Sequence, residues 1–168
     1  MNAHEDTKPP PAPNYLLVVL ITGLTVALDQ ISKHYILSYF LPGEIRPVIP
    51  DLFNLTLTFN PGAAFGLWRD IPDGWRQVVL GVTTCAALGV VFYLLKQPGY
   101  QSRLTQTALA GILGGAIGNI IDRLRHNGTV VDFLDVFWGS YHWPAFNIAD
   151  SAICLGVALL IVLPYRKE

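Results

Sequence analysis

The feature that most constrains the fold is a set of four apolar runs, each close to the length of a helix that crosses a bilayer. They cover residues 15–40, 77–96, 104–125 and 146–165 of a 168-residue chain that is 52% hydrophobic and only 14% charged. A helix of about 20 residues, rising about 1.5 Å per residue, spans the hydrocarbon core. A soluble domain of this length could not bury so much apolar surface. The sequence therefore predicts an all-α membrane protein with four transmembrane helices.

The segments outside the runs predict a tail and a small surface structure. Residues 1–14 are polar and rich in proline, so we expect a disordered tail followed by a single membrane-embedded domain over 15–168. The first run is too long for a signal-peptide core and no small-residue cleavage site follows it. The alternation in residues 52–59 predicts a small β-sheet. Apolar pairs recur every three residues in VVDFLDVFW (130–138), which predicts a short interfacial helix.

Charge and aromatic residues predict the orientation. The connections 41–76 and 123–145 are long, fall on one face of a four-span topology and contain all four tryptophans, whose rings favour the depth of lipid headgroups. Lys96 and Arg103 flank the short connection on the other face, and Arg166-Lys167 lies near the end of the chain. Because basic residues in short segments stay inside, we expect both termini in the cytoplasm and the long connections outside.

Composition excludes several functions. Formal net charge is −1 and no basic stripe exists, so nucleic acid is not an expected partner. Cys85 and Cys154 lie in separate apolar runs and the four histidines are dispersed, without CxxC or HExxH spacing. We therefore expect no metal and no other cofactor, and a packing role for both thiols.

Polar residues inside the first and third runs need an explanation, because charges at membrane depth are costly. In the first run Thr25, Asp29 and Lys33 recur every four residues, which suits an internal salt bridge or a functional site. In the third run Gly111 and Gly115 form one small-residue row, and Gly114 and Gly118 form another. Such rows favour close helix packing.

The two glycine rows lead directly to a polar cluster. Continuing the rows reaches Asn119 and Arg123 on one and Asp122 on the other, an arrangement that packing alone does not explain. Arg123 can pair with nearby loops or extend its charge toward the membrane surface. A functional site at this end of the third run is therefore a candidate.

The fourth run carries a second polar face at its beginning. Asn147, Asp150, Ser151 and Cys154 share this face, and Asp150 can either cap the helix or take part in a reaction. Asp132, 18 residues upstream, lies in the connection that returns to the same helix end. The loop can therefore bring the two carboxylates together.

Two adjacent carboxylates in a partly dry site share one proton near neutral pH. One is then a general acid and the other a general base, the logic of aspartic proteases. Asp135 is a competing carboxylate, on the same face as Asp132 if the segment is helical. No Ser–His or Cys–His alternative is supported, because the apolar runs that hold the thiols place no histidine beside them.

Five segments in order resemble the bacterial lipoprotein signal peptidases, or signal peptidase II, an aspartyl peptidase family. They are LDQISK (28–33), FNPGAAFG (59–66), GGAIGNIIDR (114–123), VVDF (130–133) and FNIADSAI (146–153). The resemblance covers nearly the whole chain after the tail. The chain departs from the family pattern in two places. It has the extra tail, and Pro61 occupies a variable position of the Asn-x-Gly-Ala-Ala motif.

The resemblance implies a membrane-embedded enzyme of the bacterial inner membrane, with its site on the extracytoplasmic side. It would remove signal peptides from diacylglyceryl-modified prolipoproteins, cutting before the lipid-bearing cysteine, in contact with membrane lipid and inhibited by peptide antibiotics of the globomycin type. Asp132 and Asp150 would form the catalytic pair. The other substrate-binding or structural polar positions implied are Asp29, Lys33, Asn60, Gly62, Asn119, Asp122, Arg123 and Asn147.

Two other functions remain open on the residues alone. A small proton-coupled transporter would also use membrane carboxylates, although four helices are few and no inverted repeat is visible. A non-catalytic assembly subunit would use the glycine rows to bind partner helices, but it leaves the clustered acids without a purpose.

Overall fold

The protein is described by a computed structural model in which residues 12–62 and 72–163 are placed. Its helices are α1 (Tyr15–Tyr39), α2 (Asp73–Leu95), α3 (Arg103–Arg125) and α4 (Ile148–Val162), with a short 3₁₀ turn, η2 (Pro98–Tyr100), between α2 and α3. The strands are β1 (Ile45–Ile49), β2 (Phe53–Asn60), β3 (Val130–Trp138) and β4 (Tyr141–His142). The expected tail lies mostly outside the described residues, as does Trp68.

Three of the described helices, α1, α2 and α3, are long and apolar enough to cross a membrane. The fourth, α4, is apolar but has 15 residues. Polar caps fix where three helices begin, because the side chains of Asn14, Ser102 and Asn147 accept hydrogen bonds from the first-turn amides of α1, α3 and α4. These three helix starts are therefore set locally by the sequence.

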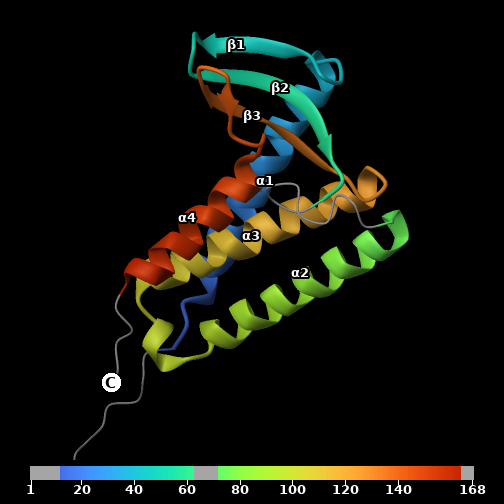
Figure 1. The fold of residues 1–168 in the computed structure, drawn as a ribbon. Coiled ribbons are helices and arrows are strands. Elements are labelled where there is room, and N and C mark those ends of the chain that lie inside the picture. The colour runs from blue at the N-terminus through green and yellow to red at the C-terminus, as the bar shows by residue number, and fades with distance from the viewer. Residues whose placement is uncertain (1–11, 63–71, 164–168) are drawn as a thin grey trace, which may run out of the picture.

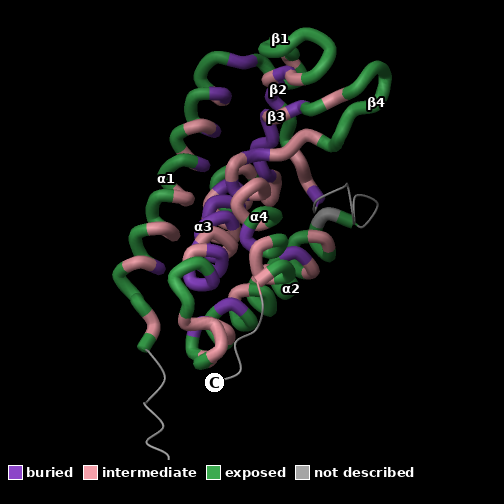
Figure 2. The backbone as a smooth tube through the Cα atoms, turned by 90° about the vertical axis from the view of Figure 1, so that its left-hand side faces the viewer, coloured by how far each residue is buried: buried purple, intermediate pink, exposed green. Residues whose placement is uncertain are grey.

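Helix α3 is the centre of the helical part. It packs against both α1 and α4, and Figure 2 shows buried residues concentrated along it, whereas α2 is largely exposed. A Cβ on Gly114 would meet Thr25 of α1, and one on Gly115 would meet the backbone of Ala149 in α4. The two glycine rows are thus confirmed as close-packing faces, one for each neighbouring helix.

The four strands form one antiparallel sheet in the order β1-β2-β3-β4. Figure 1 shows this sheet at the end of the molecule where α1 ends and α4 begins, while the turn between α2 and α3 lies at the other end. A buried cluster of Ile36, Phe40, Leu57, Val131 and Phe133 fixes the sheet on the end of α1. The strand predicted over 52–59 is confirmed as β2.

The interfacial helix expected over 130–138 is wrong, because this segment is strand β3. It pairs with β2 from Phe53↔Val136 to Asn60↔Val130. Val130, Val131 and Phe133 are all buried, so side chains on both faces of the strand are covered. Apolar residues then occur in adjacent pairs without strict alternation, and their spacing imitates that of a helix.

Candidate active site

Asp132 lies on β3 and both of its carboxylate oxygens accept hydrogen bonds from amides. Asn60 Nδ2, at the end of β2, donates to Oδ2 at 2.9 Å, and Asn147 Nδ2 donates to Oδ1 at 2.8 Å. Asn60 is itself oriented by the backbone N–H of Gly62, which donates to its Oδ1 at 2.9 Å. Two segments distant in sequence, the end of β2 and the start of α4, therefore hold this carboxylate.

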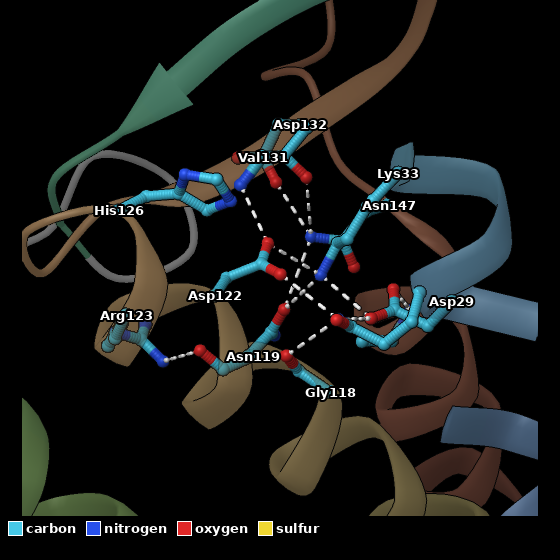
Figure 3. Close-up of polar contacts among 12 residues, drawn as sticks. Asp29, Lys33, Gly118, Asn119, Asp122, Arg123, His126, Val131, Asp132 and Asn147 are labelled. Atoms are coloured by element: carbon cyan, nitrogen blue, oxygen red, sulfur yellow. Dashed lines mark hydrogen bonds and ion pairs between the residues drawn. The ribbon is translucent and has the colours of Figure 1, made fainter. Parts of the chain in front are cut away.

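Asp150 enters the same cluster from the first turn of α4. Its Oδ1 accepts from Asn119 Nδ2 of α3 at 2.8 Å. Its backbone N–H donates to Asn147 Oδ1 at 2.9 Å, so Asn147 caps α4 while also donating to Asp132. Figure 3 shows Asn147 between Asp132 and Asn119. The expectation that loop and helix bring the two acids to one site is supported by these shared partners.

The pKa of Asp132 is raised to about 7, first by burial and second by the nearby charge of Asp150. The hydrogen bonds from Asn60 and Asn147 and the charge of Lys33 act in the opposite direction. Because the groups that donate to the Asp132 carboxylate are neutral amides, burial and the repulsion from Asp150 prevail. The carboxyl is therefore divided between its protonated and ionised forms near neutral pH.

Lys33 forms the centre of an ion cluster behind the two acids. Its Nζ lies 2.8 Å from Asp29 Oδ2, 3.0 Å from Asp122 Oδ2 and 3.1 Å from Asn119 Oδ1, and its side chain is 2% exposed. An ammonium has three N–H donors, so these three acceptors use all of them. The internal salt bridge expected between Asp29 and Lys33 is confirmed, and Lys33 has no free donor for substrate.

The two carboxylates of this cluster hold the elements that carry Asp132 and Asp150. Asp29 Oδ1 accepts from the backbone N–H of Ala149 at 3.0 Å and so supplies a second cap to α4. Asp122 Oδ2 accepts from the N–H of Val131 at 2.9 Å and fixes β3 beside α3. A Cβ on Gly118 would lie 2.5 Å from Asp29 Oδ2, so only glycine leaves room for this carboxylate.

Arg123 lies within electrostatic range of the two acids but lines a separate pocket, next to α2, and forms no ion pair among the described residues. Its Nη1 donates to Asn119 O at 3.5 Å, and its Nε is buried with no hydrogen-bond partner in the part of the chain that is placed. Its strongest electrostatic coupling is to Asp150, followed by Asp132. Arg123 therefore contributes positive potential to the site.

Asp135 is separated from Asp132, in contrast to what a helical segment would give. Residues three apart on a strand point to opposite faces. Asp135 accepts instead from Asn54 Nδ2 at 2.9 Å and lies 2.8 Å from His142 Nδ1. It belongs to the β3–β4 hairpin.

Gln30 is a site residue that the sequence analysis missed. Its Nε2 donates to Asp122 Oδ1 at 3.0 Å and to Gly118 O at 3.2 Å. It thus joins α1 to α3 beside Asp29. Its position next to an acid within an apolar run was the available signal.

Two pockets border the acids. A pocket of about 140 Å³ is lined by Asp132 and by residues 58–62, 144 and 145. A second, of about 260 Å³, is lined by Asn60, residues 143–146, Asp150, Ser151 and Cys154. Because Asn60, Pro144 and Ala145 line both, the two pockets form one trough with an aspartate in each half.

Comparison with known proteins shows which family the chain resembles. A family model described as signal peptidase (SPase) II matches residues 21–165. The lipoprotein signal peptidase of Syntrophus aciditrophicus (strain SB) is 44% identical over 154 residues, covering 91% of this chain and 95% of that protein. That of Janthinobacterium sp. (strain Marseille) is 49% identical over 147 residues, covering 88% of this chain and 87% of that protein.

Two solved structures have the same fold. Both are described as bacterial membrane enzymes solved by the in meso method, at 2.3 Å and 1.9 Å. They match with TM-scores of 0.79 and 0.77 at 32% and 30% identity, covering 90% and 92% of this chain and 88% and 96% of theirs. These comparisons give no support to the transporter alternative. The chain is a multi-pass membrane protein and belongs to the signal peptidase II family.

Proposed function

We propose that this chain is a membrane-embedded aspartyl endopeptidase that removes signal peptides from diacylglyceryl-modified prolipoproteins, cutting before the lipid-bearing cysteine. The observation that carries the proposal is the meeting of Asp132 and Asp150, from β3 and α4, at one trough in a chain of this family. Both acids share Asn147 and receive hydrogen bonds from neutral amides.

The reaction follows from one proton held by the pair. The ionised carboxylate accepts a proton from water as the water oxygen attacks the scissile carbonyl carbon. The protonated carboxyl donates its proton to the carbonyl oxygen, which gives a tetrahedral diol. The C–N bond then breaks as the carboxyl that took the proton from water passes it to the leaving amine, and the other carboxylate takes back a proton from a diol hydroxyl, so the pair again holds one proton. Because the pKa of Asp132 is raised to about 7, this half-protonated state is populated at neutral pH.

The remaining polar residues position the pair. Asn119 and Asn147 hold the carboxylates, Asn60 and Gly62 form the opposite wall, and Asp29, Lys33 and Asp122 fix α4 and β3 on α3. Arg123 is suited to stabilise negative charge that develops on the carbonyl oxygen, because its positive charge lies in the field of both acids. Peptide antibiotics of the globomycin type are proposed to occupy the same trough.

We further propose that α4 is a fourth transmembrane helix and that the protein lies in the bacterial inner membrane. Asn14 N donates to Gln106 Oε1 at 3.0 Å, so the beginning of α1 lies beside the beginning of α3. This supports a topology with the start of α1 and the α2–α3 turn on the cytoplasmic side, and the sheet and the acids on the extracytoplasmic side, in contact with membrane lipid.

The test is cleavage of a diacylglyceryl-modified prolipoprotein peptide by the purified protein in lipid. We expect release of the signal peptide, detected by mass spectrometry, with the new N-terminus at the lipid-bearing cysteine. The same peptide without lipid should remain intact. If the lipidated peptide is also left intact by a folded protein, the proposed function is wrong.

A further inference from the structure

The pocket beside Asp150 differs chemically from the rest of the trough. Its walls are residues 143–146 on one side and the first two turns of α4 on the other, with Asn60 at the end shared with the Asp132 half. The Asn60 side chain is already engaged, because its Nδ2 donates to Asp132 and its Oδ1 accepts from Gly62 N. Asp150 is the one charged side chain among the described residues that line it. The Ser151 hydroxyl already donates to Asn147 O at 2.9 Å. The pocket therefore suits an apolar group and offers few hydrogen bonds to a peptide backbone.

The pocket also extends in the direction of the membrane-facing part of α4. Cys154 lies one helical turn beyond Asp150 and is exposed. The next residue, Leu155, is 66% exposed, which is typical of an apolar side chain on a lipid-facing helix. The pocket is thus continuous at one end with the catalytic trough and at the other with the apolar surface of α4. A group that occupies it is attached close to the scissile bond and points toward lipid.

We propose that this pocket, between residues 143–146 and the Asp150–Cys154 edge of α4, binds one acyl chain of the lipid-bearing cysteine of the substrate. The inference rests on the proposed function and adds to it the site of lipid recognition. The lipid-bearing residue directly follows the scissile bond, so its acyl chains begin within a few atoms of the two acids. A cavity of about 150 Å³ holds benzene, so about 260 Å³ accommodates a longer stretch of hydrocarbon.

Filling the pocket tests the inference. Cys154→Phe places a ring at the pocket wall, and Leu155→Phe, at the next and outward-facing position, is the matched control. Two lipidated peptides that differ only in acyl length, short and long, serve as substrates. We expect Cys154→Phe to raise KM for the long-chain substrate about tenfold and to leave the short-chain KM near the wild-type value. Leu155→Phe should change neither.

Protection of the thiol gives a second measurement that does not need the bulky variant to fold. In the Asp132→Asn, Cys85→Ala protein, Cys154 is the sole remaining cysteine and is exposed. We expect the long-chain substrate to slow labelling of Cys154 by a maleimide, and the short-chain substrate to protect it much less.

The outcomes separate this inference from the proposed function. Equal protection by both acyl lengths, or protection that follows the residues before the cleavage site, would overturn the inference, since a peptide side chain would then occupy the pocket. An equal loss of activity on both substrates in Cys154→Phe would also contradict it. Failure of the wild-type protein to cleave either substrate would instead reject the proposed function.

Discussion

At the residue scale, Asp132 and Asp150 differ from the buried acids Asp29 and Asp122 by their partners. Asp29 and Asp122 contact the ammonium of Lys33, whereas Asp132 receives hydrogen bonds from neutral side-chain amides. An adjacent cation stabilises the ionised form of a carboxylate, and burial beside another acid destabilises it. The chain therefore separates structural carboxylates from a pair that can hold and transfer a proton.

Removing the ionisable proton at either acid should abolish cleavage. We expect Asp132→Asn and Asp150→Asn each to reduce kcat/KM by at least about 10²-fold, because each performs a separate proton transfer, and the double variant to be little worse than either single one. Cleavage of lipidated peptide measures the activity, and thermal unfolding in detergent checks that the variants are folded. Asp135→Asn is the control, since Asp135 lies on the other face of β3. If Asp135→Asn lost activity while Asp132→Asn kept it, Asp135 and not Asp132 would be the catalytic carboxylate.

The hydrogen bond from Asn60 should set the pH range of activity. This bond lowers the pKa of Asp132, which burial holds at about 7, so Asn60→Ala should raise that pKa. The shared proton is lost as pH rises through this pKa, so the falling limb of kcat/KM should move to higher pH in the variant. Asn54→Ala removes the equivalent amide from Asp135.

In the control variant Asn54→Ala, the falling limb of the kcat/KM profile should stay at its wild-type pH. A limb that does not move in Asn60→Ala would show that another group controls the alkaline side of the profile.

The residues of the site could be predicted from sequence where local spacing carried the signal. Asp29 and Lys33 are one helical turn apart, and Asn147 and Asp150 share a helix start. Contacts between distant segments, such as that of Asn60 with Asp132, depend on the register of β2 against β3, which no local pattern specifies. Gln30 was missed for the same reason, because its partners lie on another helix.

At the element scale, the segment 130–138 shows how a buried strand can be mistaken for a helix. Its neighbours cover both faces, so the apolar residues do not alternate, and the distinction requires knowing that β2 is its partner. The early strand β1 was also not predicted, and its Pro47 fits an edge strand, where one side of the backbone needs no partner.

The contact between α3 and α4 should tolerate no added atoms at Gly115. A Cβ there would collide with the backbone carbonyl of Ala149 and lie 2.8 Å from Ile153 Cγ1. We expect Gly115→Ala to move α4 and to lower both thermal stability and cleavage, because Asp150 follows Ala149. Gly89→Ala in α2 is the matched control, since nothing lies within 4 Å of its added atom.

Because alanine favours helix over glycine by about 1 kcal/mol, Gly89→Ala should keep or raise the stability. If Gly115→Ala behaves in the same way, the two helices are not closely packed at this point.

The β3–β4 hairpin should position one wall of the trough. His142 Nδ1 lies 2.8 Å from Asp135 Oδ1, and its ring stacks on Phe137 with centroids 4.7 Å apart. Residues 143–145 follow directly and line the substrate pockets. His142→Ala should therefore raise KM about threefold, the loss of roughly one hydrogen bond, with a smaller change in kcat.

His142→Asn, which keeps a polar atom near the position of Nδ1, should restore part of the affinity. Hydrogen exchange at Trp143, whose N–H donates to Val136 O at 2.8 Å, should be faster in His142→Ala. An unchanged KM would show that the wall is held without this pair.

At the scale of the whole molecule, the arrangement places all the chemistry at one end of the helices. The sheet lies where α1 ends and α4 begins, while α2 and α3 turn at the opposite end (Figure 1). The two acids and the trough lie at the sheet end, because Asp132 is on β3 and Asp150 is in the first turn of α4. The order of the helices and the three long spans α1, α2 and α3 could be predicted from the apolar runs, because membrane spans are encoded by length and composition. The fourth run gives the shorter helix α4, and its place as a fourth span stays a prediction. The central position of α3 could be recognised only from the way its two glycine rows pack against α1 and α4.

The orientation of this assembly in the membrane can be tested with reporters placed at three glycines. Gly43 and Gly139 lie in exposed turns beside the sheet, with positive φ values of 78° and 59° and nothing within 4 Å of an added Cβ, so an insertion after either disturbs little. Gly99 lies in η2, in the turn between α2 and α3. We expect a reporter that is active outside the cytoplasm to report activity at Gly43 and Gly139 and none at Gly99, since Lys96 and Arg103 favour a cytoplasmic turn. The inverse pattern would place the acids on the cytoplasmic side, where lipid-modified precursors exported across the membrane could not reach them, and would contradict the proposed orientation even if cleavage were seen in detergent.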